Sequence, residues 1–178
     1  MPSTWFTSDL HLDHANIIRY CGRPFQDVDE MNVRLIRYWN DRVAPSDTVY
    51  FLGDFAFTTR ARMAILRNAL HGHIVVIRGN HDRGPNALRE CGFNEVYNSL
   101  YIEVDGLGLY LRHIPDLTLE WMKGRYVLHL CGHVHEKWKY HGPIINVGVD
   151  QWDFQPRELK ELVAGVPRPF NPPVLPEK

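Results

Sequence analysis

The chain has 178 residues, of which 44% are hydrophobic and 23% charged, enough apolar residues for one buried core at a length that rarely divides into two domains. Its formal net charge of -1 at pH 7 removes the usual electrostatic argument for non-specific binding to nucleic acid. Nucleic acid is therefore a possible partner but not an indicated one.

The first half of the chain alternates short apolar runs with segments of helical spacing. Runs of strand length occupy residues 4–8, 48–52 and 74–77, and the last is almost entirely β-branched, as buried parallel strands are. Apolar residues recur at helical spacing over residues 29–43 and 59–70. The first half is thus predicted to run strand, helix, strand, helix, strand.

The second half has a different pattern. A short helix is expected over residues 85–90, followed by two antiparallel strands within residues 101–111 around an Asp-Gly turn. Two more strands and a closing helix are predicted at residues 126–130, 144–149 and 157–163. The last twelve residues are rich in proline, which favours an extended segment. We expect a single domain over residues 1–166 and a proline-rich tail over residues 167–178.

Residues with metal-binding side chains follow five of the apolar runs. Because each stands at or just past a strand end, the strands would bring oxygen and imidazole groups to one edge of a sheet. Three segments carry glycine immediately before such a residue, which lets the backbone turn sharply and approach an ion closely. The five segments are Asp9-Leu10-His11, Gly53-Asp54, Gly79-Asn80-His81-Asp82, His113 and Gly132-His133-Val134-His135.

In this order, these motifs resemble the calcineurin-like metallophosphoesterase family, whose pattern D-x-H, G-D, G-N-H-D/E, H, G-H-x-H is matched in full between residues 9 and 135. The opening segment, residues 6–18, is also similar to a subgroup of small bacterial and phage phosphoesterases. The resemblance implies an α/β fold, a two-sheet mixed β-sandwich flanked by helices in the four-layer arrangement of that family.

The resemblance also implies a role for each motif residue. One metal ion would be held by Asp9, His11, Asp54 and His135, and a second by Asp54, Asn80, His113 and His133, with Asp54 bridging the two. In the family the histidine of G-N-H-D stays off the metals and faces the leaving group. We therefore expect His81 to act as general acid, with Asp82 orienting its ring. Asn80 and Arg83 are the candidates for binding the substrate phosphate.

Two divalent cations offset by two carboxylates leave an excess of positive charge that attracts a phosphate ester and neutralises its transition state. A water shared between the ions would be deprotonated near neutral pH and attack phosphorus in line. The ligand set is hard to borderline, so we expect two divalent transition-metal ions, Mn first, with Fe, Zn, Ni or Co as alternatives.

The predicted function is hydrolysis of a small or nucleotide-like phosphodiester. Phosphomonoester or nucleotidase activity remains open. Two further alternatives are a metal-binding scaffold for protein interactions without catalysis, since relatives of this fold have lost ligands, and hydrolysis of amides or lactones. The oligomeric state is not indicated.

Several residues near the motifs have less specific patterns. Asp13 and Asn16 suit the start of a short helix through Ile17. Arg19 and Arg23 are expected to be solvated at the surface. Asp150 follows a predicted strand at the same sheet edge, and we take it as a candidate to support a ligand from behind.

The cysteines indicate the compartment. Cys21, Cys91 and Cys131 match neither a disulfide framework nor a Cys-x-x-Cys zinc signature, and Cys131 is predicted to be a packed thiol. The amino terminus lacks a basic segment followed by an apolar one, and no apolar stretch of about 18 residues occurs. We expect a soluble, cytoplasmic protein without a membrane partner.

Overall fold

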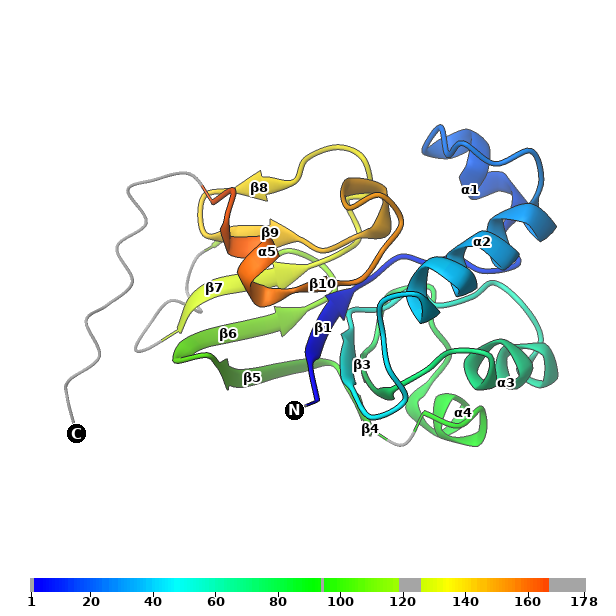
Figure 1. Ribbon diagram of the computed structural model, residues 1–178, viewed down its shortest axis with the longest axis horizontal. Coiled ribbons are helices and arrows are strands. Elements are labelled where there is room, and N and C mark those ends of the chain that lie inside the picture. Colours follow the sequence, from blue (N-terminus) through cyan, green and yellow to red (C-terminus); the bar gives the residue numbers. More distant parts are fainter. Residues whose placement is uncertain (1, 94, 119–125, 167–178) are drawn as a thin grey trace.

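The computed structural model describes residues 2–93, 95–118 and 126–166. Two five-stranded sheets pack against each other, and helices cover the first of them on the side away from the second (Figure 1). The helices are α1 (Ala15–Tyr20), α2 (Val28–Asn40), α3 (Arg60–Asn68), α4 (Pro85–Glu90) and α5 (Leu159–Val163).

The first sheet is mostly parallel. Its strands lie in the order β10 (Arg157–Glu158), β1 (Thr4–Thr7), β2 (Thr48–Phe51), β3 (His73–Ile77) and β4 (Glu95–Tyr97). The strands β1 to β4 pair in parallel, as the alternation with helices predicts, and β10 is added antiparallel to β1. Thr7, Phe51 and Val76 stand side by side in the register, so the segments that follow β1, β2 and β3 emerge together at one edge.

The second sheet is mixed rather than antiparallel throughout. Its order is β5 (Ser99–Val104), β6 (Leu107–Arg112), β7 (Tyr126–Cys131), β9 (Ile144–Asn146) and β8 (Tyr140–His141). The predicted antiparallel pair around the Asp-Gly turn is present as β5 and β6. The three inner strands β6, β7 and β9 pair in parallel, because the chain crosses over between them instead of turning back directly.

Two apolar cores hold these layers together. One lies between the first sheet and the helices and contains Met31, Leu35, Trp39 and Phe51. The other fills the space between the sheets, with Phe6, Leu52, Ile77, Leu109 and Leu130 among its buried residues. The predicted two-sheet α/β sandwich flanked by helices is therefore confirmed. In the part of the chain that the structure describes, helices α1 to α4 flank the first sheet, whereas α5 closes the sandwich beside β10.

Two of the element boundaries that differ from expectation have local reasons. The strand predicted over residues 144–149 ends at Asn146, and a 3-10 turn follows at Val149–Gln151. The closing helix predicted from residue 157 begins at Leu159, because Arg157 and Glu158 pair with β1 before the capping box of Glu158 and Glu161 starts the helix. No described helix has the length and apolar character needed to span a membrane, and the predicted tail, residues 167–178, lies outside the described residues.

Candidate metal centre

The carboxyl ends of strands from both sheets meet at one place. Residues from the loops after β1, β2, β3, β6 and β7 come together there. The backbone N–H of His133 donates to both oxygens of Asp9, at 3.2 and 3.0 Å, which joins the second sheet to the first. The two sheets are joined a second time where the Val149 N–H donates to the carbonyl of Ser8, at 3.1 Å.

The expected ligand atoms converge without touching. His11 Nε2 lies 3.8 Å from Asp9 Oδ1 and 3.5 Å from Asp54 Oδ2. His135 Nε2 lies 3.9 Å from Asp9 Oδ1. Donor atoms about 2.0–2.2 Å from one ion stand roughly 3 to 3.5 Å apart around it. The spacing is therefore close to what a shared cation requires.

A second set converges on the other side of Asp54. His113 Nε2 lies 3.3 Å from Asp54 Oδ2 and 3.0 Å from Asn80 Oδ1. The other ring nitrogen of His113, Nδ1, donates to the Leu52 carbonyl at 2.6 Å, which fixes the ring and turns Nε2 toward the acids. His133, the remaining expected ligand, is exposed at the rim, with its ring 5.4 Å from that of His113.

Two buried polar atoms at the centre have no hydrogen-bond partner: His11 Nε2 and Asp54 Oδ2. Their residues are only 3% and 2% exposed, so solvent does not compensate for the missing bonds. Burial of unsatisfied polar atoms is costly unless a ligand or ion completes them. A histidine nitrogen and a carboxylate oxygen are also donors that divalent transition metals prefer. The residues present therefore fit the expected metal centre.

The backbone is strained where these side chains leave it. Asp9, His11, Asp54, His133 and His135 all adopt left-handed conformations, with φ of 59°, 50°, 59°, 71° and 48°. Such conformations cost free energy for residues other than glycine and cluster at functional sites. Hydrogen bonds maintain them here. The Asp9 N–H donates to the Gly53 carbonyl at 2.9 Å, and the His11 N–H donates to the Asp54 carbonyl at 3.0 Å.

The motif glycines are needed for space. A Cβ on Gly79 would overlap the Asp54 carboxylate, and one on Gly132 would overlap Asp9 and Ser8. A Cβ on Gly53 would overlap the backbone of Gly79. The glycines thus allow close packing between the motifs, and the approach of their backbone to an ion stays a prediction.

The electrostatics of the centre favour positive charge. Burial opposes the charged form of Asp54, but the His113 ring, whose Nε2 lies 3.3 Å from Asp54 Oδ2, outweighs it and lowers the pKa of Asp54 to about 2. Burial would lower the pKa of His113, yet Asp54 and Asp9 raise it to about 9. Burial lowers the pKa of His11 to about 3, so this ring stays neutral with a free lone pair. Asp54 thus remains ionised at the centre, whereas burial raises the pKa of Asp9.

A buried ion pair supports the centre from behind. Arg23 is 4% exposed, and its guanidinium donates to both oxygens of Asp150, at 2.8 and 3.0 Å. It also donates to the carbonyls of Asp9 and Leu10, at 2.7 and 2.9 Å. Asp150 Oδ2 in turn lies 3.2 Å from His135 Nδ1. The expectation that Arg23 is solvated is wrong, because a single arginine following a glycine carries no sequence signal for burial.

His81 and Asp82 are placed differently from each other. His81 is exposed at the mouth of the site, with its ring 5.9 Å from that of His11. Asp82 is buried, and its carboxylate accepts hydrogen bonds from the backbone N–H groups of Asp54, Phe55 and Gly79. The hydrogen bonds described for Asp82 thus tie the β2 and β3 turns together. No hydrogen bond between Asp82 and the His81 ring is described, so the orienting role of Asp82 stays a prediction.

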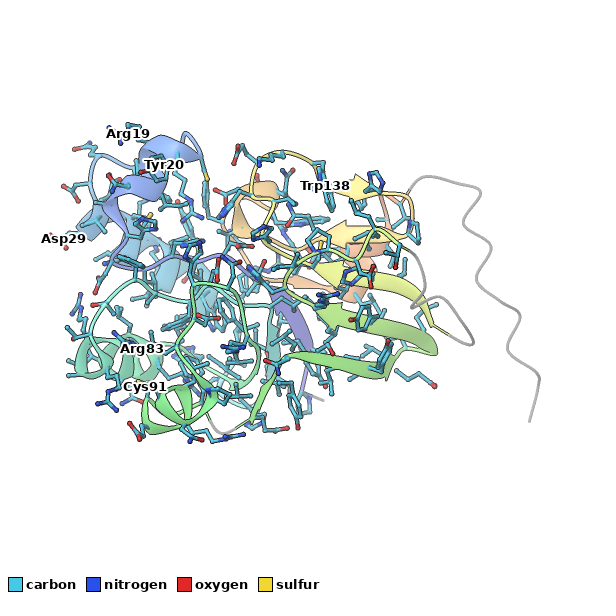
Figure 2. The ribbon with its side chains drawn as sticks, turned by 180° about the vertical axis from the view of Figure 1, so that it is seen from behind. Arg19, Tyr20, Asp29, Arg83, Cys91 and Trp138 are labelled. Carbon is cyan, nitrogen blue, oxygen red and sulfur yellow. The ribbon has the colours of Figure 1, made fainter. Side chains whose placement is uncertain are left out.

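Two cavities adjoin these residues. One, of about 560 Å³, is lined by Phe57, Thr58, His81 and Arg83 among others. The second, of about 290 Å³, is lined by Arg78, Asn80, Arg112 and His113 among others. Arg83 donates to the Thr58 carbonyl at 2.6 Å. Figure 2 shows Arg83 on the loop that leads into α4, on the helical half of the molecule, whereas Trp138 lies on the side of the second sheet.

Two residues outside the motifs have different outcomes. Asp13 does not cap α1, which begins after His14, because its carboxylate accepts from Asn32 instead. Cys131 is fully buried, which confirms the predicted packed thiol, and burial raises its pKa.

Comparisons with known proteins agree with this geometry. A family model described as calcineurin-like phosphoesterase matches residues 2–164. An uncharacterized protein of Methanocaldococcus jannaschii is 37% identical over 172 residues, 92% of this chain and 90% of its own length. The gene 66 protein of Mycobacterium phage D29 is 30% identical over 198 residues, 93% of this chain and 98% of its own. A solved structure of a protein of unknown function from Aquifex aeolicus superposes with a TM-score of 0.74 and 26% identity, covering 91% of this chain and 98% of that one.

Proposed function

We propose that this chain, which belongs to the calcineurin-like phosphoesterase family, is a dinuclear phosphodiesterase that acts on a small or nucleotide-like ester. Membership of the family makes it a metal-dependent hydrolase of phosphate esters. The number of ions, the preference for diesters and the roles of individual residues are our proposal.

The observation that carries the proposal is the pair of unsatisfied buried atoms, His11 Nε2 and Asp54 Oδ2, at the centre of the converging side chains. Asp54 Oδ2 is 3.5 Å from His11 Nε2 on one side and 3.3 Å from His113 Nε2 on the other. A carboxylate oxygen placed between two imidazoles in this way suits a bridge between two ions.

We assign the same two sets of residues that the motifs suggest. Asp9, His11, Asp54 and His135 would hold one ion, and Asp54, Asn80, His113 and His133 the other. When bound, two divalent cations would supply Lewis-acid activation of water and neutralise charge on the phosphate. The oxygen and nitrogen donors favour manganese among the candidates, with Fe, Zn, Ni or Co as alternatives.

The chain's own residues would bind the ester and move a proton. His81, exposed at the mouth, is placed to donate a proton to the leaving oxygen. The Asn80 amide and the Arg83 guanidinium would bind phosphate oxygens. Asp82 would hold the turn that carries Asn80 and His81 in position through its three backbone hydrogen bonds.

The two cavities favour a diester over a monoester. One includes His81 and the other includes Asn80, so they reach the site at consecutive residues. A diester has two substituents on phosphorus and can use both cavities, whereas a monoester needs one. The three free cysteines suit a reducing, cytoplasmic location.

The test is turnover after reconstitution with manganese. We expect hydrolysis of bis-nitrophenyl phosphate with a kcat/KM at least about tenfold above that of nitrophenyl phosphate, since phosphodiester preference is the claim. Asp54→Asn should lower kcat by at least about a thousandfold, because it removes the bridging charge from both ions.

A matched control is Asp105→Asn, which alters an exposed aspartate in the turn between β5 and β6, at the opposite end of β6 from His113. It should retain activity. Preferred hydrolysis of the monoester would replace the diester assignment with a phosphomonoesterase. Full activity of Asp54→Asn would contradict the proposed ligand set.

A further inference from the structure

We infer that three rings beside the metal centre, His14, Phe57 and Tyr20, here called the aromatic ledge, form a subsite for the nucleobase of the substrate. The inference rests on the proposed function, because it takes the ester to be cut at the metal centre. It adds the chemical class of one substituent, a nucleoside.

The rings of the aromatic ledge continue outward from a proposed metal ligand. The His14 ring lies 5.5 Å from that of His11, and the Phe57 ring lies 5.1 Å from that of His14. Tyr20 meets His14 edge-on at 6.3 Å. A substituent on a phosphorus held at the centre would therefore reach these rings directly. Ring faces at such spacing are suited to stacking a planar group.

The ledge is exposed although it is apolar. Tyr20 is 61% and Phe57 is 62% exposed, which makes them the two most exposed of the described phenylalanine, tyrosine and tryptophan residues. Folding gains little from placing such rings in water, and exposed aromatics next to a site often serve binding. Tyr20 is on α1 and Phe57 on the loop after β2, so two separate segments of the chain contribute rings to one place.

The ledge is also held firmly. The Phe57 N–H donates to the Leu12 carbonyl at 2.9 Å, and the His14 N–H donates to the His11 carbonyl at 3.1 Å. The segments after β1 and β2 thus run side by side past the strand ends, which fixes Phe57 next to His14. A pre-ordered ring loses little entropy when a base stacks on it.

Two arginine side chains lie near the ledge. Phe57 lines the cavity of about 560 Å³ that also contains Arg83 and His81, a volume within the usual range for small-molecule sites. The Arg19 guanidinium lies over the Tyr20 ring, 5.5 Å from its centroid, and Figure 2 shows both residues together on α1. Flat apolar faces combined with cations match a nucleotide, which joins a planar base to an anionic phosphate. An aliphatic alcohol or a lipid chain would use neither the flat faces nor the cations around them.

The experiment compares two ligands that differ only in the base. Calorimetry on the manganese-loaded protein would give dissociation constants for adenosine 5′-monophosphate and for ribose 5-phosphate. We expect the nucleotide to bind about 5- to 100-fold more tightly, the range for stacking of one base on an aromatic side chain. Phe57→Ala and Tyr20→Ala should each reduce that ratio, and the double variant should bring it near one.

Two control variants show whether the effect depends on a ring at the ledge. Phe57→Trp should preserve the ratio, because it retains a ring face. Tyr97→Ala removes another partly exposed aromatic, on β4, and should leave the ratio unchanged. Equal binding of the two ligands by the unmodified protein, or a ratio that survives in the double variant, would overturn the inference.

The readout is binding, so it is independent of turnover. If the protein binds the nucleotide more tightly than ribose 5-phosphate but does not hydrolyse diesters, the proposed function is wrong and the base subsite is supported. If it hydrolyses diesters but binds both ligands equally, the proposed function is supported and the base subsite is wrong. A 5′-phosphorylated adenylate trinucleotide separates the two sources of a base. Tighter binding than the mononucleotide points to a nucleic-acid end and equal binding to a free nucleotide, and both results support a base subsite.

Discussion

Asp54 uses its two carboxylate oxygens in different ways. Oδ1 accepts a hydrogen bond from the His81 N–H at 2.9 Å, whereas Oδ2 is buried with no hydrogen-bond partner. The first contact holds the turn that carries His81, and the second oxygen faces His11 and His113. One side chain thus connects the position of the proposed proton donor to that of the proposed ions.

His81→Asn tests the assignment of the proton donor. Esters with a poor, alkoxide leaving group need a proton from the enzyme, whereas nitrophenolate leaves without one. We therefore expect kcat on an alkyl phosphodiester to fall by about 10²- to 10⁴-fold, and kcat on bis-nitrophenyl phosphate to fall far less. Steady-state kinetics on both esters would measure the difference.

Asn keeps a polar side chain of similar size at this position, so the turn should be retained. The melting temperature of the His81→Asn variant, compared with that of the unmodified protein, provides the check on folding. Equal losses on both esters in a folded variant would contradict proton donation by His81.

The turns at the strand ends depend on close packing between consecutive motifs. Gly79 follows β3, and a Cβ there would overlap Asp54 Oδ1 and lie 2.6 Å from Asp54 N. Gly79→Ala should therefore displace the carboxylate, destabilise the fold by about 1–3 kcal/mol, and lower metal affinity by at least about tenfold. Denaturant unfolding and metal titration would measure the two effects.

Gly84→Ala is the matched control. Gly84 precedes α4, and a Cβ there would meet nothing within 4 Å. This change should alter stability by no more than about 0.5 kcal/mol and leave metal affinity intact. Similar metal affinity in both alanine variants would argue against the steric role of Gly79.

Elements with strong local signals were predicted well from the sequence. The β-branched run of β3 and the Thr59 side chain that caps α3, accepting from the Arg62 N–H at 3.3 Å, have local causes. The two-residue strands β8 and β10 were missed, because they form only when a distant strand offers its edge. The parallel pairing of β6 with β7 likewise depends on how the chain crosses the sheet.

At the site, too, features with a local sequence signal were predicted, and features that depend on distant residues were missed. The motif residues converge as their order along parallel strands predicts, because strand ends share an edge. The ion pair of Arg23 with Asp150 joins residues 127 positions apart and was not predicted as a pair. The backbone hydrogen bonds of Asp82 were also missed, since a carboxylate in a loop offers no signal that distinguishes an N–H partner from an imidazole.

Across the molecule as a whole, stability should depend on pH through a histidine outside the proposed ligand set. His129, on β7, is fully buried; its Nδ1 donates to the Tyr110 carbonyl at 3.0 Å, and its Nε2 accepts from the Asp116 N–H at 3.1 Å. These bonds use the neutral ring. Burial accordingly lowers the pKa of His129 from 6.5 to about 4.

The direction of the change in stability with pH follows from the number of protons that the folded and unfolded chains bind. Between pH 6.5 and about 4 the unfolded chain binds a proton at this position and the folded chain does not. This contribution to stability is therefore present above pH 6.5 and is lost as pH falls toward 4, by roughly 3 kcal/mol for the full shift. Burial lowers the pKa of His11 as well, so the unmodified protein will show more than one contribution.

Comparison with His129→Gln isolates the contribution of this residue. Denaturant unfolding from pH 7 to pH 4.5 should give a free energy of unfolding that falls more steeply for the unmodified protein than for the variant. Parallel curves for the two proteins would contradict the assignment to His129.

The two sheets meet at Asp9, which accepts from the His133 N–H, and the proposed ions would lie at this junction. Crystals grown with manganese and measured at its absorption edge locate the ions directly. We predict two anomalous peaks on either side of Asp54 Oδ2, one near His11 and His135 and the other near His113 and His133. A map without a peak beside Asp54, or with a single ion that Asp54 does not contact, would contradict a bridged two-metal centre.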